Sequence, residues 1–203
     1  MPRKLTRFLT CALLPATLLG TSGATSAHEH PRAESHATLE PAAKSMANCS
    51  DLAVRLEPAG DFPTMKCSTG QTGYGDGYSI FSEIVAENAI SRIVIIHQYA
   101  GNHTYLAPVG SRTLNEEMLD WDIRGSWSPA IAFGGYEVRR FFGRPESATV
   151  PCFAFARYAG HVARSAGYRN RVFGYYCEDI ASDQPVPDGR VNEVIDKIKA
   201  RIF

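Results

Sequence analysis

Residues 151–177, with the sequence PCFAFARYAGHVARSAGYRNRVFGYYC, decide how this chain folds. Two runs rich in apolar and aromatic residues, 151–158 and 171–177, flank a more polar stretch. This is the pattern of two antiparallel strands joined by a loop. The stretch therefore predicts a long β-hairpin near the end of the domain.

The cysteines agree with this hairpin. With the loop centred near residue 164, Cys152 lies directly opposite Cys177, where Cβ atoms roughly 4.5–5.5 Å apart can adjust to form a disulfide. The remaining two cysteines of the mature chain, Cys49 and Cys67, would then form a second disulfide at the start of the domain. Because the chain has no Cys-x-x-Cys pair, we expect these cysteines to be structural rather than redox-active or zinc-binding.

The first 27 residues have the pattern of a secretory signal peptide. A basic start is followed by an apolar run over 8–19, which is too short to cross a membrane, and then by small residues. We expect cleavage after Ala27, with Ala24 as the alternative. The exported protein would be periplasmic or secreted, where disulfides persist, and no later stretch predicts a membrane span.

The mature chain is predicted to be a flexible tether followed by one domain. Residues 28–48 lack the large apolar side chains that would offset the cost of ordering them. Residues 49–203 are long enough for a single hydrophobic core. Three of the 21 basic residues and none of the 21 acidic residues lie in the signal peptide, so the mature chain has a net charge of −3. This balance argues against a nucleic-acid partner.

Two amphipathic helices are predicted at the two sides of the domain. Ile80, Phe81, Ile84 and Val85 recur at helical spacing and predict a helix over 78–90. A second helix, beginning at Asp188, is predicted from one apolar stripe: Val191, Val194, Ile195, Ile198 and Ile202.

Several short strands are predicted between these helices. The β-branched run 92–99 ends at Gly101 and Asn102, which predicts a hairpin with 103–108 as the returning strand. Alternating apolar and acidic residues predict a strand over 119–123. Gly134 and Gly135 predict a turn that joins two further strands, 131–133 and 136–138.

Together these elements predict an α+β fold. Short connections favour antiparallel neighbours. The two helices need an apolar face to cover, and a sheet provides one. We therefore expect an antiparallel meander of about six strands, with one helix on its N-terminal side and a C-terminal helix packed on it.

The second half of the hairpin carries the favoured candidate binding surface. Arginine and tyrosine are enriched at protein interfaces, and arginine binds carboxylate and phosphate groups in a bidentate manner. We expect a surface that binds a protein or an anionic ligand, formed by Arg164, Arg169, Arg171, Tyr168 and Tyr175. The leading hypothesis is accordingly an exported, non-enzymatic binding module that needs no cofactor. A basic edge that merely discourages aggregation is the simpler alternative.

A second hypothesis is a hydrolase-like enzyme. Its general base would be His97 or His161, and its carboxylate would be Asp120 or Asp122. The hypothesis requires a fold that brings one histidine and one carboxylate within hydrogen-bond reach. The sequence contains no nucleophile motif that would support it.

A third hypothesis is copper or nickel binding at the new N-terminus. After cleavage at Ala27 the chain would begin with His28, Glu29 and His30, whose amine, backbone nitrogens and imidazole can form a square-planar site. N-terminal sequencing of the exported protein tests this hypothesis, because a cut after Ala24 would remove the site.

Overall fold

The fold is built on one antiparallel sheet. The computed structural model describes residues 44–74, 77–102, 104–110, 122–124, 126–144, 148–162 and 167–201. Within these residues the sheet has nine strands, of which eight follow the order β1-β3-β4-β5-β10-β9-β8-β6 while β7 pairs with β8. In chain order the strands of this sheet are β1 (Ser45–Met46), β3 (Thr64–Tyr74), β4 (Gly77–Glu87), β5 (Ser91–Ala100), β6 (Asp122–Arg124), β7 (Ile131–Phe133), β8 (Tyr136–Arg144), β9 (Val150–Val162) and β10 (Gly167–Glu178).

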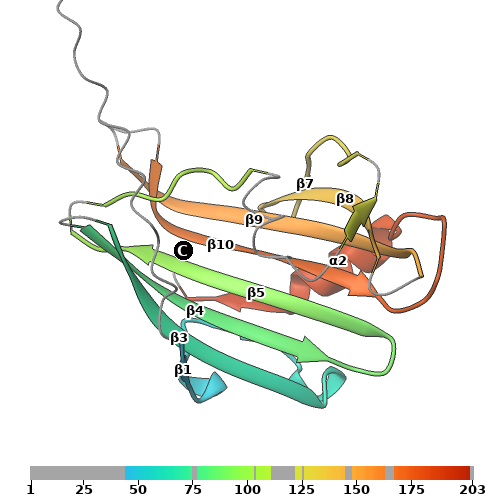
Figure 1. Ribbon diagram of the computed structural model, residues 1–203, viewed down its shortest axis with the longest axis horizontal. Coiled ribbons are helices and arrows are strands. Elements are labelled where there is room, and N and C mark those ends of the chain that lie inside the picture. Colours follow the sequence, from blue (N-terminus) through green and yellow to red (C-terminus); the bar gives the residue numbers. More distant parts are fainter. Residues whose placement is uncertain are drawn as a thin grey trace, which may run out of the picture. The chain divides into compact units, whose positions relative to one another are not determined.

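Two meanders meet at the centre of this sheet. Strands β3, β4 and β5 form one meander, and β8, β9 and β10 form the other (Figure 1). They join where β5 pairs with β10, from Asn170 opposite Tyr99 to Glu178 opposite Ser91. A Cβ atom at Gly174, in the middle of β10, would lie 1.9 Å from the carbonyl oxygen of Val94. The close approach of the two backbones therefore requires glycine at this position.

Both faces of the sheet are covered over its central strands. One face, here called the helix face, packs against the α-helix α2 (Asp188–Lys197) and the two-stranded sheet of β2 (Val54–Leu56) and β11 (Ile198–Ala200). On the opposite face, side chains from the β5–β8 connection, including Val109 and Trp127, pack against the strands. The rings of Trp127 and Phe141 lie 4.4 Å apart between centroids. Because both faces are covered, apolar residues occur at both odd and even positions along the central strands.

A side chain of β8 holds the start of α2. The Arg140 Nε donates to the carbonyl oxygen of Val186 at 2.7 Å, and its Nη2 bonds to the carboxylate of Asp188. The residue before the helix, Pro187, makes no side-chain capping bond. An acidic residue in the first turn also interacts favourably with the helix dipole. Arg140 therefore links the helix to the sheet where a cap is missing.

The α+β expectation is wrong, because the described part of the chain is mostly β. It contains one α-helix, α2, and two single-turn 3-10 helices, Cys49–Asp51 and Ala59–Asp61. The C-terminal helix is present where it was expected, but the helix on the N-terminal side is absent.

The segment predicted to be that first helix is the strand β4. Its apolar residues alternate between the two faces, since Ile84 packs in the helix-face core and Val85 packs against the opposite one. Adjacent buried residues on a strand covered on both sides give the same spacing as one face of a helix. The spacing alone could not separate the two structures.

The hairpin predicted at Gly101 and Asn102 is also wrong. Strand β5 pairs with β4 on one side and β10 on the other, so no edge remains for 103–108. After β5 the chain instead forms a single bridge, between Leu106 and Tyr168. The turn sequence at Gly101 and Asn102 does not decide the pairing of β5, because β10, far along the chain, occupies the edge that a hairpin would have used.

Two other hairpins are confirmed. Gly134 and Gly135 adopt φ angles of +55° and +81° and join β7 to β8, with Phe133 opposite Tyr136. Such angles are those of a two-residue hairpin turn that favours glycine. Strands β9 and β10 pair in the predicted register, which places Cys152 opposite Cys177.

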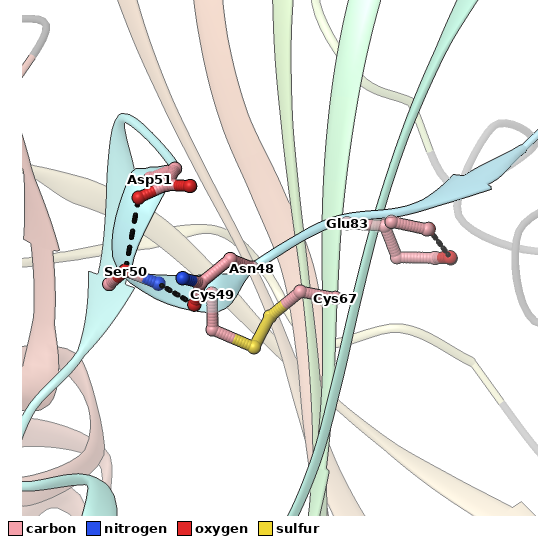
Figure 2. The surroundings of a disulfide bond; sticks show 7 residues. Asn48, Cys49, Ser50, Asp51, Cys67 and Glu83 are labelled. Atoms are coloured by element: carbon pink, nitrogen blue, oxygen red, sulfur yellow. Dashed lines mark hydrogen bonds between the residues drawn. A yellow bond between two sulfur atoms is a disulfide. The ribbon is translucent and has the colours of Figure 1, made fainter.

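Both predicted disulfides are present. Cys152 bonds to Cys177, and Cys49 bonds to Cys67. Figure 2 shows the second bond, in which the 3-10 helix that begins at Cys49 is tied to β3. The side chain of Asn48 caps this short helix by accepting from the backbone N–H of Ser50 at 3.2 Å. Two disulfides are consistent with an oxidising compartment, and none of the described helices is long and apolar enough to cross a membrane.

Gly174→Ala should destabilise the domain by about 3 kcal/mol, because the added methyl group meets backbone that cannot rotate away. Gly189→Ala is the matched control, since a Cβ atom there meets nothing within 4 Å and the residue lies in α2. The control should be neutral or more stable by up to about 1 kcal/mol. Urea unfolding with intact disulfides measures both, and equal effects would contradict the close backbone approach.

Glu193→Gln should weaken the domain more at about pH 6 than at about pH 3. Hydrogen bonds from Lys197 and Arg190 lower the pKa of Glu193 to about 2. A carboxylate with a lowered pKa stabilises the folded state fully above its unfolded pKa, and this stabilisation is lost as the pH falls toward 2. Urea midpoints of both proteins at the two pH values test this, and a constant difference would refute it.

Candidate functional site

Tyrosines gather at one end of the sheet. At this end β4 begins, β5 ends, and the β9–β10 hairpin closes (Figure 1). We call it the tyrosine end, defined by Tyr78, Tyr99, Tyr105, Tyr158 and Tyr168. Two of these side chains are strongly exposed, Tyr99 at 44% and Tyr105 at 56%.

Two of these rings lie directly against glycine residues. A Cβ atom at Gly101 would lie 2.4 Å from the ring of Tyr78, and one at Gly167 would lie 2.3 Å from the ring of Tyr105. A residue with a side chain would displace either ring. The two glycines therefore position aromatic rings on the sheet surface, as aromatic side chains cover glycines elsewhere in β-proteins.

The other aromatic residues form a stack on the hairpin. The rings of Tyr158 and Tyr168 lie 4.7 Å apart with an interplanar angle of 26°, and the His161 ring meets Tyr168 edge-on at 5.7 Å. The Tyr158 hydroxyl accepts from the backbone N–H of Val109 at 2.9 Å. Burial raises the pKa of Tyr158, so its hydroxyl stays protonated at neutral pH.

Arginines bind the segment 104–110, here called the strap, to the sheet. Arg169 Nη1 donates to the carbonyl oxygens of Gly101 at 2.9 Å and Thr104 at 3.4 Å. Arg171 donates from Nε to Gln98 at 2.6 Å and from Nη1 to the Ala107 carbonyl oxygen at 2.8 Å. Because guanidinium groups offer five N–H donors in a planar fork, each arginine can hold two partners at once.

Positive charges outnumber negative ones at this end, where Glu137 lies close enough to Tyr158 to act on its pKa and is itself paired with Arg139. The described segments here are 77–82, 97–102, 104–110, 157–162 and 167–171, and they contain no aspartate or glutamate. They do contain three arginines, Arg157, Arg169 and Arg171. A mainly positive end on a chain whose formal net charge is zero favours negatively charged ligands.

No family model, curated protein or solved structure matches this chain. Its function must therefore be inferred from its own residues.

The predicted binding residues fall into three groups. Tyr168 and Arg169 lie at the tyrosine end, and Arg171 lies beside them holding the strap. Tyr175 is only 4% exposed and packs in the core of the opposite face. Arg164 lies outside the described residues. A binding role for these residues remains a prediction.

Within the described residues, the backbone pairing does not place Asp122 beside His97, and Asp120 lies outside those residues. His97 faces Val172, while Asp122 pairs with Arg144 at the far end of β8. His97 Nε2 lies 3.4 Å from the side-chain oxygen of Asn170. Burial lowers the pKa of His97, which keeps the ring neutral at neutral pH. His161 lies at the tyrosine end.

No metal site is found within the described residues, where no three His, Cys, Asp or Glu side chains cluster suitably. His28 and His30, the proposed copper or nickel ligands, lie outside the described residues, as does Asp120. The cysteines are held in disulfides.

Sequence reasoning missed three tyrosines of this end: Tyr78, Tyr99 and Tyr105. The signal that could have revealed two of them is the presence of glycines at which strands turn, Gly101 and Gly167. To match each glycine with its tyrosine, one must know that β4 begins beside the end of β5 and that the strap lies against the start of β10. Those contacts depend on pairings that the sequence did not reveal.

Arg171→Lys should loosen the strap without unfolding the sheet. Lysine keeps the charge but lacks the planar fork that holds both Gln98 and Ala107. We expect hydrogen exchange of the amides in 104–110 to become about tenfold faster, which corresponds to about 1.4 kcal/mol. Arg92→Lys, at an ion pair with Glu87 at the other end of β5, is the control and should leave the strap unchanged. Equal exchange in both variants would contradict the role of Arg171.

Proposed function

We propose that this protein is an exported, non-enzymatic interaction module that binds an acidic surface of a protein partner through the tyrosine end. The observation that carries the proposal is the coincidence of exposed tyrosines with three arginines at that end, where the nearby Glu137 is already paired with Arg139.

The exposed aromatic area supports a protein partner. Tyr99 and Tyr105 present large rings together with the exposed side chain of Ile80, which lies directly opposite Tyr99. Tyrosine is enriched at interfaces because it gives a large contact area for few rotatable bonds. Rings that already lie against glycine or against each other lose little further freedom on binding.

The arginines support an acidic partner. Arg169 is exposed, and its bonds to the carbonyl oxygens of Gly101 and Thr104 come from Nη1. Its Nε and Nη2 donors take no part in these two bonds. Such donors match the two oxygens of a carboxylate. The sequence prediction named Arg169 and Tyr168 for this role, and the proposed surface keeps both.

The hydrolase alternative has less support. It would need His97 or His161 to work with Asp120 or Asp122, and the side chain that His97 meets is the amide of Asn170. An amide orients an imidazole but stabilises its protonated form less than a carboxylate does.

Replacing Tyr99 and Tyr105 together by serine should weaken partner capture at least about tenfold, because hot-spot aromatics dominate interface energies. The measurement is capture by the immobilised chain from the exported proteins of its own host, followed by quantitative mass spectrometry. Capture should also fall as salt rises from about 0.05 to about 0.5 M, since surface charges are screened.

The matched control replaces Met46 and Ile131 by serine. Both side chains are exposed and lie outside the tyrosine end. This control should capture the same partner as the unaltered protein. Equal capture by both double variants would refute the proposed surface.

A further inference from the structure

We propose that the acidic surface recognised by the tyrosine end is the opposite end of a second copy of this chain, so that the protein associates head to tail. This inference rests on the proposed function and names its partner.

The opposite end of the sheet carries an acidic loop. Residues 178–187, which connect β10 to α2, contain Glu178, Asp179 and Asp183 and no lysine or arginine. Glu178 is already engaged by Arg190, 3.3 Å away. Asp179 and Asp183 are exposed, so their carboxylates lie at the surface.

Exposed aliphatic side chains accompany these acids. Ile90 is 51% exposed and Ile180 is 52% exposed. The two segments are in contact, because the backbone N–H of Asp179 donates to the carbonyl oxygen of Ile90 at 2.7 Å. The acidic loop and the turn before β5 therefore form one surface that is both aliphatic and negatively charged.

The two ends complement each other chemically. The tyrosine end offers Tyr99, Tyr105 and Ile80 with three arginines, and Glu137 beside it is paired with Arg139. The acidic loop and the turn before β5 offer Ile180 and Ile90 with the carboxylates of Asp179 and Asp183, while Glu178 is engaged by Arg190 and Arg92 is paired with Glu87. Contact between them would bury apolar area and pair opposite charges, whereas either end against its own copy would oppose like charges.

The acidic loop cannot reach the tyrosine end of its own molecule. Strand β10 begins at the tyrosine end and runs for 12 residues before the loop starts. At about 3.3 Å per residue the strand separates the two ends by roughly 40 Å. Only another copy can bring the two surfaces together, and the contact then joins two different patches, as heterologous interfaces do.

Two variants test this geometry, each altering one end. Tyr99→Glu places an acid in the tyrosine end, and Asp179→Lys with Asp183→Lys reverses the exposed charge of the loop. Sedimentation velocity at low salt should show concentration-dependent association of the unaltered protein and only monomer for each variant alone. Asp51→Lys with Asp196→Lys is the matched charge control, since both acids are exposed and lie outside the loop, and it should still associate.

Mixing the two variants gives the decisive measurement. The Tyr99→Glu chain keeps an intact loop, and the loop variant keeps an intact tyrosine end, so the mixture should form dimers through one intact interface. Circular dichroism checks that each variant is folded, and Tyr99→Ser in place of Tyr99→Glu provides a second test of the same end.

The outcomes separate the two proposals. A monomeric unaltered protein at all concentrations, or a mixture that stays monomeric while both variants are folded, overturns head-to-tail association. If such a protein still captures a different partner through Tyr99 and Tyr105, the proposed function stands without self-association. If the tyrosine end also captures nothing, both proposals fail.

Discussion

The pairing of β5 with β10 is the interaction on which the rest of the structure depends. It joins two meanders that are each local in sequence, and it creates the two apolar faces on which the remaining segments pack. The backbones approach so closely that Gly174 has no room for a side chain. Without this pairing, α2 and the β2–β11 sheet would have no continuous helix face to cover, and the strap would lose its place beside β10.

The same pairing explains which parts of the fold could be predicted. Hairpins closed by local signals were predicted correctly: the glycine turn at Gly134 and Gly135, and the β9–β10 register with its disulfide. The helix α2 was also predicted from its apolar stripe, because only one face of that helix is buried and the other is exposed to solvent. Each of these features is decided by residues close together in the chain.

The errors arose where distant partners decide the structure. Strand β4 was read as a helix because burial on both faces hides the period of two. Strand β5 was given a local partner because Gly101 and Asn102 resemble a hairpin turn, although β10 occupies that edge. The candidate site was affected in the same way. Arg169 and Tyr168 were found on the hairpin, whereas Tyr99 and Tyr105 join them only through long-range pairing.

The placement of β2 and β11 has a consequence for how the protein is made. Leu56, early in the domain, pairs with Ile198, which lies a few residues before the C-terminal end of this sequence. Pairs such as β2 with β11, far apart in the chain, raise the contact order of the domain and slow its closure, because long loops must be ordered before these contacts form. Strand β2 therefore has no strand partner until β11 has been synthesised. A domain that closes late stays unfolded for longer during synthesis. This suits a protein that we expect to be exported in an unfolded state.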